Sequence, residues 1–273
     1  MSIRAAMHVH STWSYDGHWA LDRIVPEFTR RGYQVLLMTE HDLGFSEERR
    51  QQYWAACRQA STDRLLVIPG MEYSDPSNTI HLLVWGDIPF LGAGQETMTV
   101  LEKVTAAGGV CVLAHPSRRS AWRLFRSEWR QHLAGIEIWN RKTDGWAASA
   151  EATRLIAETG ARATVGLDFH SAKQLFPLAV LLELEGRPEE AKVLAALRHG
   201  AFRGEALGRE VTAFTGKIAG PATRVLEGGR RLAARTYRFA VSSAQQVASW
   251  TKPRPGPGRK PNPKSTPAAP END

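Results

Sequence analysis

The stretch IRAAMHVH at residues 3–10 joins an apolar run to a pair of histidines. The run predicts a short strand, and His8 and His10, as alternate residues of that strand, project from the same face. Two imidazoles on one face can bind one ion, because nitrogen ligands suit Zn, Mn and Fe. One such pair is weak evidence by itself, so its meaning depends on the residues that accompany it.

Other residues of ligand type follow or border further short apolar runs. They are Asp16, His41, Glu72, His81, His115, Asp168 and His170. The C-terminal ends of strands in a parallel barrel converge on one mouth, and we therefore expect these side chains to meet there. With the first pair they make nine ligands, more than the roughly four to six positions around one ion. The set favours two or three divalent ions that share a bridging carboxylate.

Apolar runs alternate with amphipathic stretches as far as residue 199. The predicted strands are 3–9, 34–39, 65–68, 81–85, 110–114, 135–139 and 163–167, with a further one at 178–184. The predicted helices are 21–31, 47–60, 96–107, 147–159 and 188–199. Such alternation is typical of an α/β protein with a parallel sheet and helices outside it. The number of repeats favours a closed or nearly closed barrel over an open sheet.

The bulk composition is that of an ordinary globular protein. The chain has 273 residues, of which 42% are hydrophobic and 23% charged. No apolar run approaches the roughly 18 residues that a membrane span needs, and the start of the sequence has no apolar secretory segment. Cys57 and Cys111 predict no disulfide framework and are expected to be buried apolar residues. We expect a cytoplasmic protein with no transmembrane segment.

The positive charge is concentrated at the C-terminal end. The net charge is +7, yet residues 203–273 hold 13 Lys and Arg against 5 Asp and Glu. Residues 1–202 are therefore almost neutral. A reading of the whole protein as a nucleic-acid binder does not fit this distribution.

The same region changes in character, and we divide the chain into three parts. Residues 1–205 are the predicted metallohydrolase barrel, 206–250 predict basic amphipathic helices, and 251–273 are rich in Pro, Lys and Arg and predict disorder. We favour a reading in which the helices pack on the barrel. Alternatively, residues 206–264 contact an anionic membrane surface or nucleic-acid phosphates.

At the ligand positions the chain resembles the polymerase and histidinol phosphatase (PHP) family of metal-dependent phosphoesterases, in its small stand-alone form. The matching pieces occur in family order and cover roughly residues 3–203. They are HVHSTWSYDG (8–17), TEHD (39–42), GMEYS (70–74), His81 within IHLLVWG, AHP (114–116) and GLDFH (166–170).

The resemblance implies a distorted (β/α)7 TIM-like barrel with a trinuclear Zn, Mn or Fe site at its mouth. The first ion would be held by His8, His10, Glu72 and Asp168. Glu72 would bridge to a second ion at His81 and His115, and the third would be held by Asp16, His41 and His170. A bridging hydroxide would be the nucleophile, which places Asp16, His41, Glu72 and Asp168 in the catalytic centre.

The chain departs from the family pattern at two motifs. It has Glu40-His41-Asp42 where the family often has Asp-His-Asp, and Asp16 where some members have His. The second difference weakens an assignment as a histidinol phosphatase. Glu40, Asp42 and Glu137 are candidates for orienting the ligands from behind, as carboxylates do at metal sites.

Basic residues follow the fifth and sixth predicted strands. Arg118, Arg119 and Arg141, together with Lys142, are candidates for binding a substrate phosphate, since the guanidinium fork matches phosphate oxygens. A solvated basic surface is the alternative for each of them. Arg118 is the strongest candidate because it lies just beyond His115.

These observations favour a metal-dependent hydrolase that acts on a small phosphorylated substrate, a phosphate monoester or diester. The resemblance to small stand-alone PHP proteins points to a nucleotide or a short oligonucleotide. One alternative is a module that binds nucleic acid or a membrane through its basic C-terminal region. Another is a metal-dependent amidohydrolase, because the same hydroxide could attack an amide.

Overall fold

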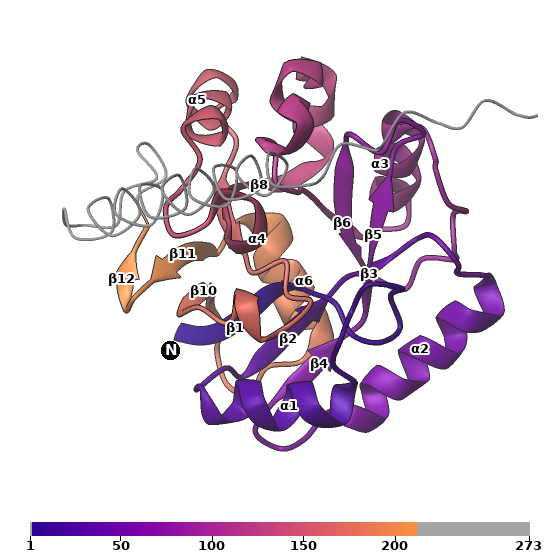
Figure 1. Ribbon diagram of the computed structural model, residues 1–273, viewed down its shortest axis with the longest axis vertical. Helices are drawn as coiled ribbons and strands as arrows, with labels where there is room; N and C mark the ends of the chain where they lie inside the picture. The colour runs from indigo at the N-terminus through magenta and orange to yellow at the C-terminus, as the bar shows by residue number, and fades with distance from the viewer. Residues whose placement is uncertain (1, 212–273) are drawn as a thin grey trace, which may run out of the picture. The chain divides into compact units, whose positions relative to one another are not determined.

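Two sheets of six strands each form the centre of the computed structural model, which describes residues 2–211 (Figure 1). Met1 and residues 212–273 lie outside the described residues. Most of the predicted helical extension, 206–250, and all of the predicted disordered tail, 251–273, therefore lie outside them as well. For residues 2–211 the predicted α/β class is confirmed.

The first sheet carries the histidine pair on an inner strand. Its order is β12-β11-β10-β1-β2-β4, in which β1, β2 and β4 are parallel and β10 runs antiparallel to β1. All of β2 is buried, as expected of a parallel strand covered on both faces. The bounds are β1 Ser2–Val9, β2 Val35–Met38, β4 Leu66–Ile68, β10 Leu178–Glu183, β11 Phe202–Ala206 and β12 Arg209–Glu210.

The second sheet has the order β3-β5-β6-β7-β8-β9. Its strand β6 runs antiparallel to both β5 and β7, so the prediction of a parallel sheet is wrong at this strand. The connection 75–80 before β6 is too short for the crossover that parallel neighbours need. The bounds are β3 Glu40–His41, β5 Gly70–Ser74, β6 His81–Trp85, β7 Val110–Leu113, β8 Leu133–Asn140 and β9 Ala163–Gly166.

Short chain connections on one side and backbone hydrogen bonds on the other join the two sheets. The chain passes from β2 to β3 through Thr39 alone, and from β4 to β5 through Pro69 alone. On the other side, the backbone N–H groups of Leu167 and Phe169 donate to the carbonyls of Met7 and His8, at 2.9 and 3.0 Å. The segment after β9 therefore pairs with the end of β1, which brings the ligand-bearing ends of both sheets together.

Helices cover the outside of the strands. α1 and α2 lie side by side next to β4 (Figure 1), and each buries an apolar stripe, such as Ile24 and Phe28 in α1. Ser46 caps α2 by accepting a hydrogen bond from the Arg49 N–H at 3.2 Å. The α-helices are α1 Leu21–Arg30, α2 Glu47–Ala60, α3 Thr97–Ala106, α4 Arg141–Asp144, α5 Ala150–Thr159 and α6 Glu190–His199. The 3-10 segments are η1 Arg118–Leu124, η2 Ser127–His132 and η3 Ala172–Gln174.

Strand pairing crosses the predicted boundary at residue 205. β11 and β12 form a hairpin over 202–210, and Val211 after it is buried, so this part of the chain is strand where the extension was predicted to be helical. Cys57 and Cys111 are both buried thiols, as predicted. Over residues 2–211, no helix combines the length and the apolar character needed to cross a membrane.

Candidate metal centre

Three of the predicted ligands have an uncommon backbone conformation at or just after a strand end. His8, His115 and Asp168 have φ angles of 66°, 24° and 48°. Residues other than glycine seldom adopt positive φ, and such strain persists only where the surroundings impose it. At His8 the pairing of β1 with β2 also shifts by one residue, a bulge that re-aims the side chain. The backbone is thus bent at the positions from which the ligands converge.

The carboxylate of Glu72, in the middle of β5, lies at the centre of the cluster. Its Oε2 is 3.1–3.3 Å from ring nitrogens of three histidines, and its Oε1 is 2.6–3.0 Å from those of two others. The first three are His8, His10 and His41, and the other two are His81 and His115. One buried carboxylate therefore faces five imidazoles, three through Oε2 and two through Oε1.

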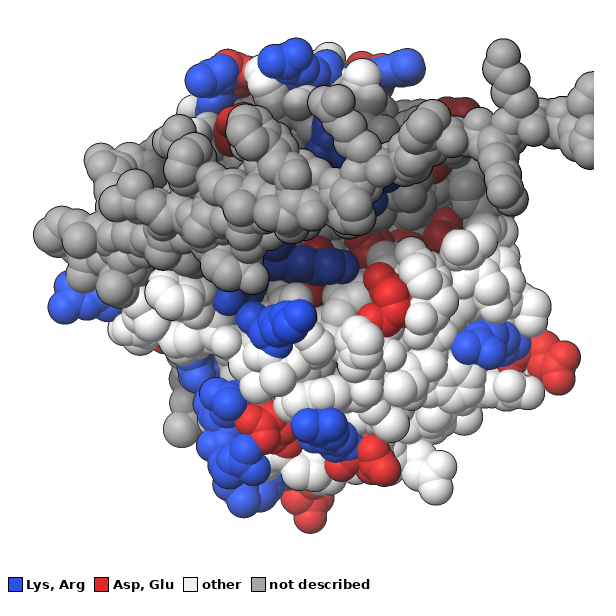
Figure 2. Space-filling model, viewed as in Figure 1, with Lys and Arg blue, Asp and Glu red and all other residues white. Residues whose placement is uncertain are grey.

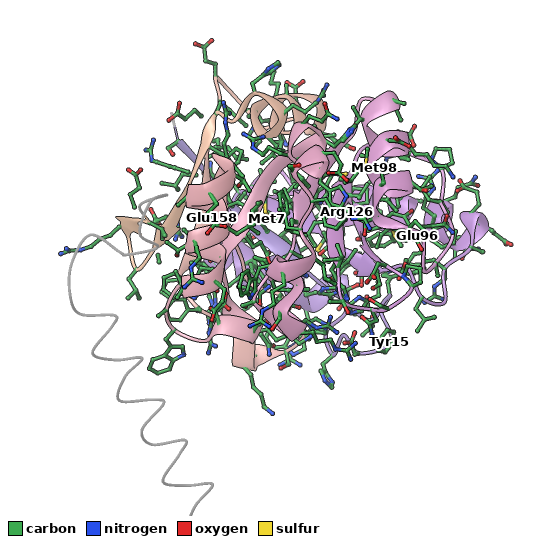
Figure 3. All side chains as sticks on the ribbon, turned by 90° about the horizontal axis from the view of Figure 1, so that it is seen from above. Met7, Tyr15, Glu96, Met98, Arg126 and Glu158 are labelled. Atoms are coloured by element: carbon green, nitrogen blue, oxygen red, sulfur yellow. The ribbon has the colours of Figure 1, made fainter. Side chains whose placement is uncertain are left out.

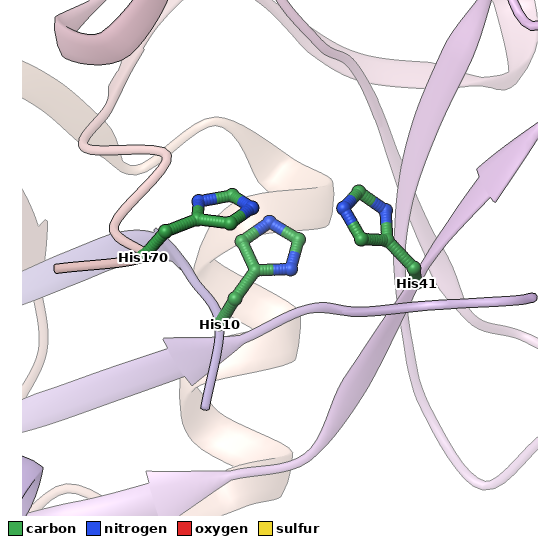
Figure 4. A group of neighbouring side chains, drawn as sticks. All are labelled: His10, His41 and His170. Carbon is green, nitrogen blue, oxygen red and sulfur yellow. The ribbon is translucent and has the colours of Figure 1, made fainter. Parts of the chain in front are cut away.

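Two further carboxylates complete the cluster. Asp168 Oδ1 is 3.7 Å from the Nε2 atoms of His8 and His10, and 3.3 Å from His170 Nδ1. Asp16 contacts His170 Nε2 at 3.1 Å and His41 Nε2 at 3.4 Å. Figure 4 shows the rings of His10, His41 and His170 turned toward a common point. All nine predicted ligands thus lie in one cluster.

The donor set fits divalent cations. Several of its atoms are buried with no hydrogen-bond partner among the described residues: His8 Nε2, His10 Nε2, His115 Nδ1, Asp16 Oδ1 and Glu72 Oε2. A buried polar atom without a partner costs about 1–3 kcal/mol. Cations at the common point would offset that cost. The ligand atoms form three groups, each within 4.8 Å: His8–His10–Asp168, His8–Glu72–His115 and His10–His41–His170.

Positively charged neighbours favour the ionised form of two carboxylates in the cluster. Burial disfavours the charged form of Glu72, but the imidazoles of His8, His81 and His41 outweigh it and hold the pKa of this carboxyl well below its usual range. Burial likewise opposes ionisation of Asp168, yet His8 and Lys142 lower its pKa. Both carboxyls are therefore charged near neutral pH, the form that binds a metal.

Glu137, on β8, lies behind two of the ligands. Its Oε1 accepts a hydrogen bond from His8 Nδ1 at 2.9 Å, and its Oε2 accepts one from the His115 backbone N–H at 2.8 Å. Asn140 Nδ2 also donates to Oε2, at 2.9 Å. Gly166 makes room for this carboxylate, because a Cβ there would lie 1.7 Å from Oε1. Glu137 thus contacts the ring of His8 and the backbone of His115 from behind the cluster.

Glu40 supports the ligands through the loop after β1. It accepts hydrogen bonds from the hydroxyls of Ser11 and Ser14, at 2.6 and 2.5 Å, and burial raises its pKa to about 7. The Ser14 Oγ also accepts from the His41 N–H at 3.0 Å and lies 3.3 Å from His10 Nδ1.

Asp42 has a different environment. It accepts hydrogen bonds from the backbone N–H groups of Ser74 and Gly94, at 3.2 and 3.0 Å, and so ties the end of β5 to the loop before α3. Burial raises the pKa of this carboxyl.

A cavity of about 270 Å³ opens above Glu72. Two cations line it: Arg118, whose Nη1 lies 3.0 Å from His81 Nε2, and Lys142, whose Nζ lies 3.5 Å from Asp168 Oδ1. In Figure 2, basic and acidic side chains lie together in a recessed part of this face. A larger hollow of about 900 Å³ is lined by other residues, including Tyr33, Leu65 and Pro188, and by none of the predicted ligands.

The other two candidate arginines donate to backbone carbonyls. Arg119 Nη1 donates to the Asn78 carbonyl at 2.9 Å, and Arg141 Nη2 donates to the Lys173 carbonyl at 3.1 Å. Neither lines the cavity above Glu72. The lining does include Tyr15, Leu43 and Asn78, which sequence reasoning did not single out. Little in the sequence marks them as site residues, because Tyr15 and Leu43 are ordinary residues that happen to stand beside the predicted Asp16 and Asp42.

Comparison with known proteins supports the fold. No protein-family model and no curated protein matches the sequence. Among solved structures, the match to a two-domain protein from Bacteroides vulgatus containing a predicted PHP-like metal-dependent phosphoesterase has 16% identity and a TM-score of 0.60. It covers 78% of this chain and 67% of that chain. PsfC from Pseudomonas syringae matches with 14% identity and a TM-score of 0.55, over 88% of this chain and 99% of that one. The resemblance inferred from the motifs is thereby confirmed at the level of the fold.

Proposed function

We propose that this chain is a metal-dependent hydrolase of phosphate esters, with its reaction centre at Glu72. The observation that carries the proposal is the convergence of nine predicted ligand side chains in one cluster, six of which line a cavity together with Arg118 and Lys142. The fold shared with a protein containing a PHP-like phosphoesterase supports it. The cations favour a phosphate ester over an amide, because fixed positive charge matches phosphoryl oxygens.

We further infer that seven strands close into the distorted barrel that the resemblance implies. The order would be β1, β2 with β3, β4 with β5, then β6, β7, β8 and β9. The hydrogen bonds from Leu167 and Phe169 to β1 support closure between the last strand and the first. Closure explains why ligands from both sheets face one cavity.

Two or three ions of Zn, Mn or Fe would occupy the cluster. The first would be held by His8, His10, Asp168 and Glu72, the second by Glu72, His81 and His115, and the third by Asp16, His41 and His170. The three donor groups in the structure support this division in part, since the second group includes His8 in place of His81 and the third includes His10 in place of Asp16. Asp16 nevertheless contacts both His41 and His170.

The chain's own residues would do the remaining work of the reaction. When bound, the ions would supply hydroxide near neutral pH and offset charge on the phosphoryl oxygens. Arg118 and Lys142 would hold the non-bridging oxygens in place, and Glu137 would keep His8 in the tautomer that binds a cation. The resemblance favours a nucleotide or short oligonucleotide ester, and the small cavity suits a phosphoryl group with part of its leaving group.

Metal content and ester hydrolysis test the proposal together. Wild type and His10→Ala would be compared by mass-spectrometric metal analysis, and with p-nitrophenyl phosphate and bis(p-nitrophenyl) phosphate after addition of Mn or Zn. His199→Ala is the matched control, since His199 is exposed at the end of α6. We expect two to three ions per chain and hydrolysis that only His10→Ala abolishes. A metal-free, inactive wild type would contradict the proposal.

One further variant separates an enzyme from a module that acts through its basic C-terminal region. Because β12 and Val211 belong to the first sheet, the deletion should begin at residue 212. An enzyme with its centre at Glu72 keeps ester hydrolysis after this deletion. A protein that acts through residues 206–264 loses its function.

A further inference from the structure

The rim of the cavity above Glu72 is apolar on one side. Among the described residues, the two most exposed large hydrophobic side chains are Tyr15, 70% exposed, and Leu43, 64% exposed. They come from different loops, and both line the same cavity. Single exposed apolar residues are common on protein surfaces. Two such residues at the edge of one polar cavity, however, form a small apolar surface beside it. We call Tyr15 and Leu43 the apolar rim.

Local contacts fix the position of the Tyr15 ring. It stacks on the ring of His41 with centroids 5.2 Å apart and planes 22° apart. The neighbours of Tyr15 are also tied down, since Ser14 donates to Glu40 and Asp16 contacts His170. The ring therefore has one supported face while most of its surface reaches solvent, at the periphery of the view in Figure 3.

Leu43 also stands on a fixed backbone. It follows Asp42, whose carboxylate accepts hydrogen bonds from the N–H groups of Ser74 and Gly94. An exposed leucine on an anchored turn adds no folding stability through burial, because its side chain stays in water. Both parts of the rim are thus presented to the cavity without a loop having to be ordered first, which keeps the cost of binding low.

The cavity contains cations as well as the rim. Arg118 and Lys142 line it together with Tyr15 and Leu43. A ligand that contacts all four residues needs an anionic group and an uncharged, flat or apolar group a short distance from it. A phosphate ester with an aromatic ring in its alcohol portion has this construction, whereas inorganic phosphate or a short alkyl ester lacks the second part.

We propose that the apolar rim is a leaving-group subsite, in which an aromatic ring of the ester's alcohol stacks on Tyr15 and packs against Leu43. This proposal rests on the proposed phosphoesterase function and names the residues that set its substrate preference. Stacking of a base on one aromatic side chain changes affinity by about 5- to 150-fold. An ester with an aromatic ring is therefore preferred over an equally charged ester without one.

A matched pair of substrates tests the subsite. 2-Phenylethyl phosphate and ethyl phosphate carry the same charge and release alcohols of similar acidity, so their kcat/KM ratio reports the ring alone. The methyl diesters of the same alcohols serve if only diesters are hydrolysed. We expect the ratio to fall about tenfold in Tyr15→Ala and several-fold in Leu43→Ser. Tyr15→Phe, which keeps the ring, should retain it, and metal content should be the same in all four proteins.

The outcomes separate this proposal from the proposed function. If wild type hydrolyses both esters with equal kcat/KM, or if Tyr15→Ala leaves the ratio unchanged, the subsite is wrong while the phosphoesterase stands. If wild type hydrolyses neither these monoesters and their methyl diesters nor the p-nitrophenyl esters, the proposed function fails. Calorimetric binding of 2-phenylethylphosphonate against ethylphosphonate to the metal-loaded protein then decides the subsite. A preference for the aromatic ligand that Tyr15→Ala removes supports it, and equal binding overturns it.

Discussion

The carboxylate of Glu137 lies 2.9 Å from Nδ1 of His8, on the opposite side of the ring from the metal-binding cluster. Because His8 Nδ1–H donates to this carboxylate, the other ring nitrogen, Nε2, faces Glu72 and Asp168 at 3.3 and 3.7 Å. The orientation of the ring is therefore set before any ion binds, and a cation would have only to displace the proton on Nε2. Gly166 is required for this arrangement, since any larger residue would displace Glu137.

Replacement of Glu137 by Gln should weaken metal binding about 10- to 100-fold. All three neighbours of this carboxylate, His8, His115 and Asn140, are donors, and the amide group of Gln would have to face one of them. Competition with a chromophoric chelator measures the affinity. Glu128→Gln, at an exposed position in η2, controls for loss of a charge. Equal affinities in the two variants would show that Glu137 does not orient the ligands.

Lys142 and Arg141 are adjacent in the sequence but have different surroundings, which gives a direct comparison. Lys142 lines the cavity, whereas Arg141 donates to the Lys173 carbonyl and lies over the ring of Phe176. We expect Lys142→Ala to lower kcat/KM for a phosphate ester about 10- to 100-fold, the loss of one charge-assisted contact to phosphate. Arg141→Ala should lower it by no more than about threefold. The reverse order would place the phosphate on the other side of α4.

Ser14 joins Glu40 to two ligands, and its removal should reduce stability. Ser14→Ala leaves the His41 N–H without its acceptor and Glu40 without one of its donors, both buried. Leaving such groups unpaired should lower the free energy of unfolding by about 1–3 kcal/mol. Ser77→Ala removes a similar hydroxyl-to-carboxylate bond, to Asp75, at an exposed site and should cost less than about 1 kcal/mol. Urea unfolding of the metal-free proteins gives both values, and equal losses would argue against a supporting role for Ser14.

His81 shows how far the site could be predicted from the sequence. The ligand was predicted from its residue type beside an apolar run, and it does lie in the cluster. Its strand was predicted to be parallel, yet His81 begins β6, which runs antiparallel to its neighbours. Reversal of the strand brings its first residue to the edge where β5 and β7 end. The apolar pattern indicates that a strand exists and does not encode its direction.

Other features depend on geometry that a sequence pattern does not carry. The sequence groups Arg118, Arg119, Arg141 and Lys142 as one basic set, and only the fold separates the two that line the cavity. The positive φ angles of His8 and His115 are imposed by tertiary packing on residues that do not normally favour them. Tyr15 looks like a loop residue until its stacking on His41 is seen.

Asp144 should make the free energy of unfolding depend on pH, whereas an asparagine at this position should not. It accepts hydrogen bonds from the Ser117 hydroxyl at 2.6 Å and the Asn140 N–H at 2.8 Å, but burial raises its pKa from 3.8 to about 6. The folded state therefore binds this proton more tightly than the unfolded state does. The contribution to stability is present below the unfolded pKa and is lost as pH rises from about 4 to about 6. The loss amounts to about 2 to 3 kcal/mol.

Asp144→Asn keeps both hydrogen bonds, since its carbonyl can accept from Asn140 and its amide can donate to the Ser117 oxygen. The variant should equal wild type near pH 4 and become more stable by about 2 to 3 kcal/mol at pH 7. Denaturant unfolding of the metal-free proteins between these pH values measures the difference, because bound ions would add a pH-dependent stabilisation of their own. Asp63→Asn, at a side chain 96% exposed, should show no such trend. If the difference in unfolding free energy between Asp144→Asn and wild type does not change between pH 4 and pH 7, the pKa of Asp144 is not raised in the folded protein.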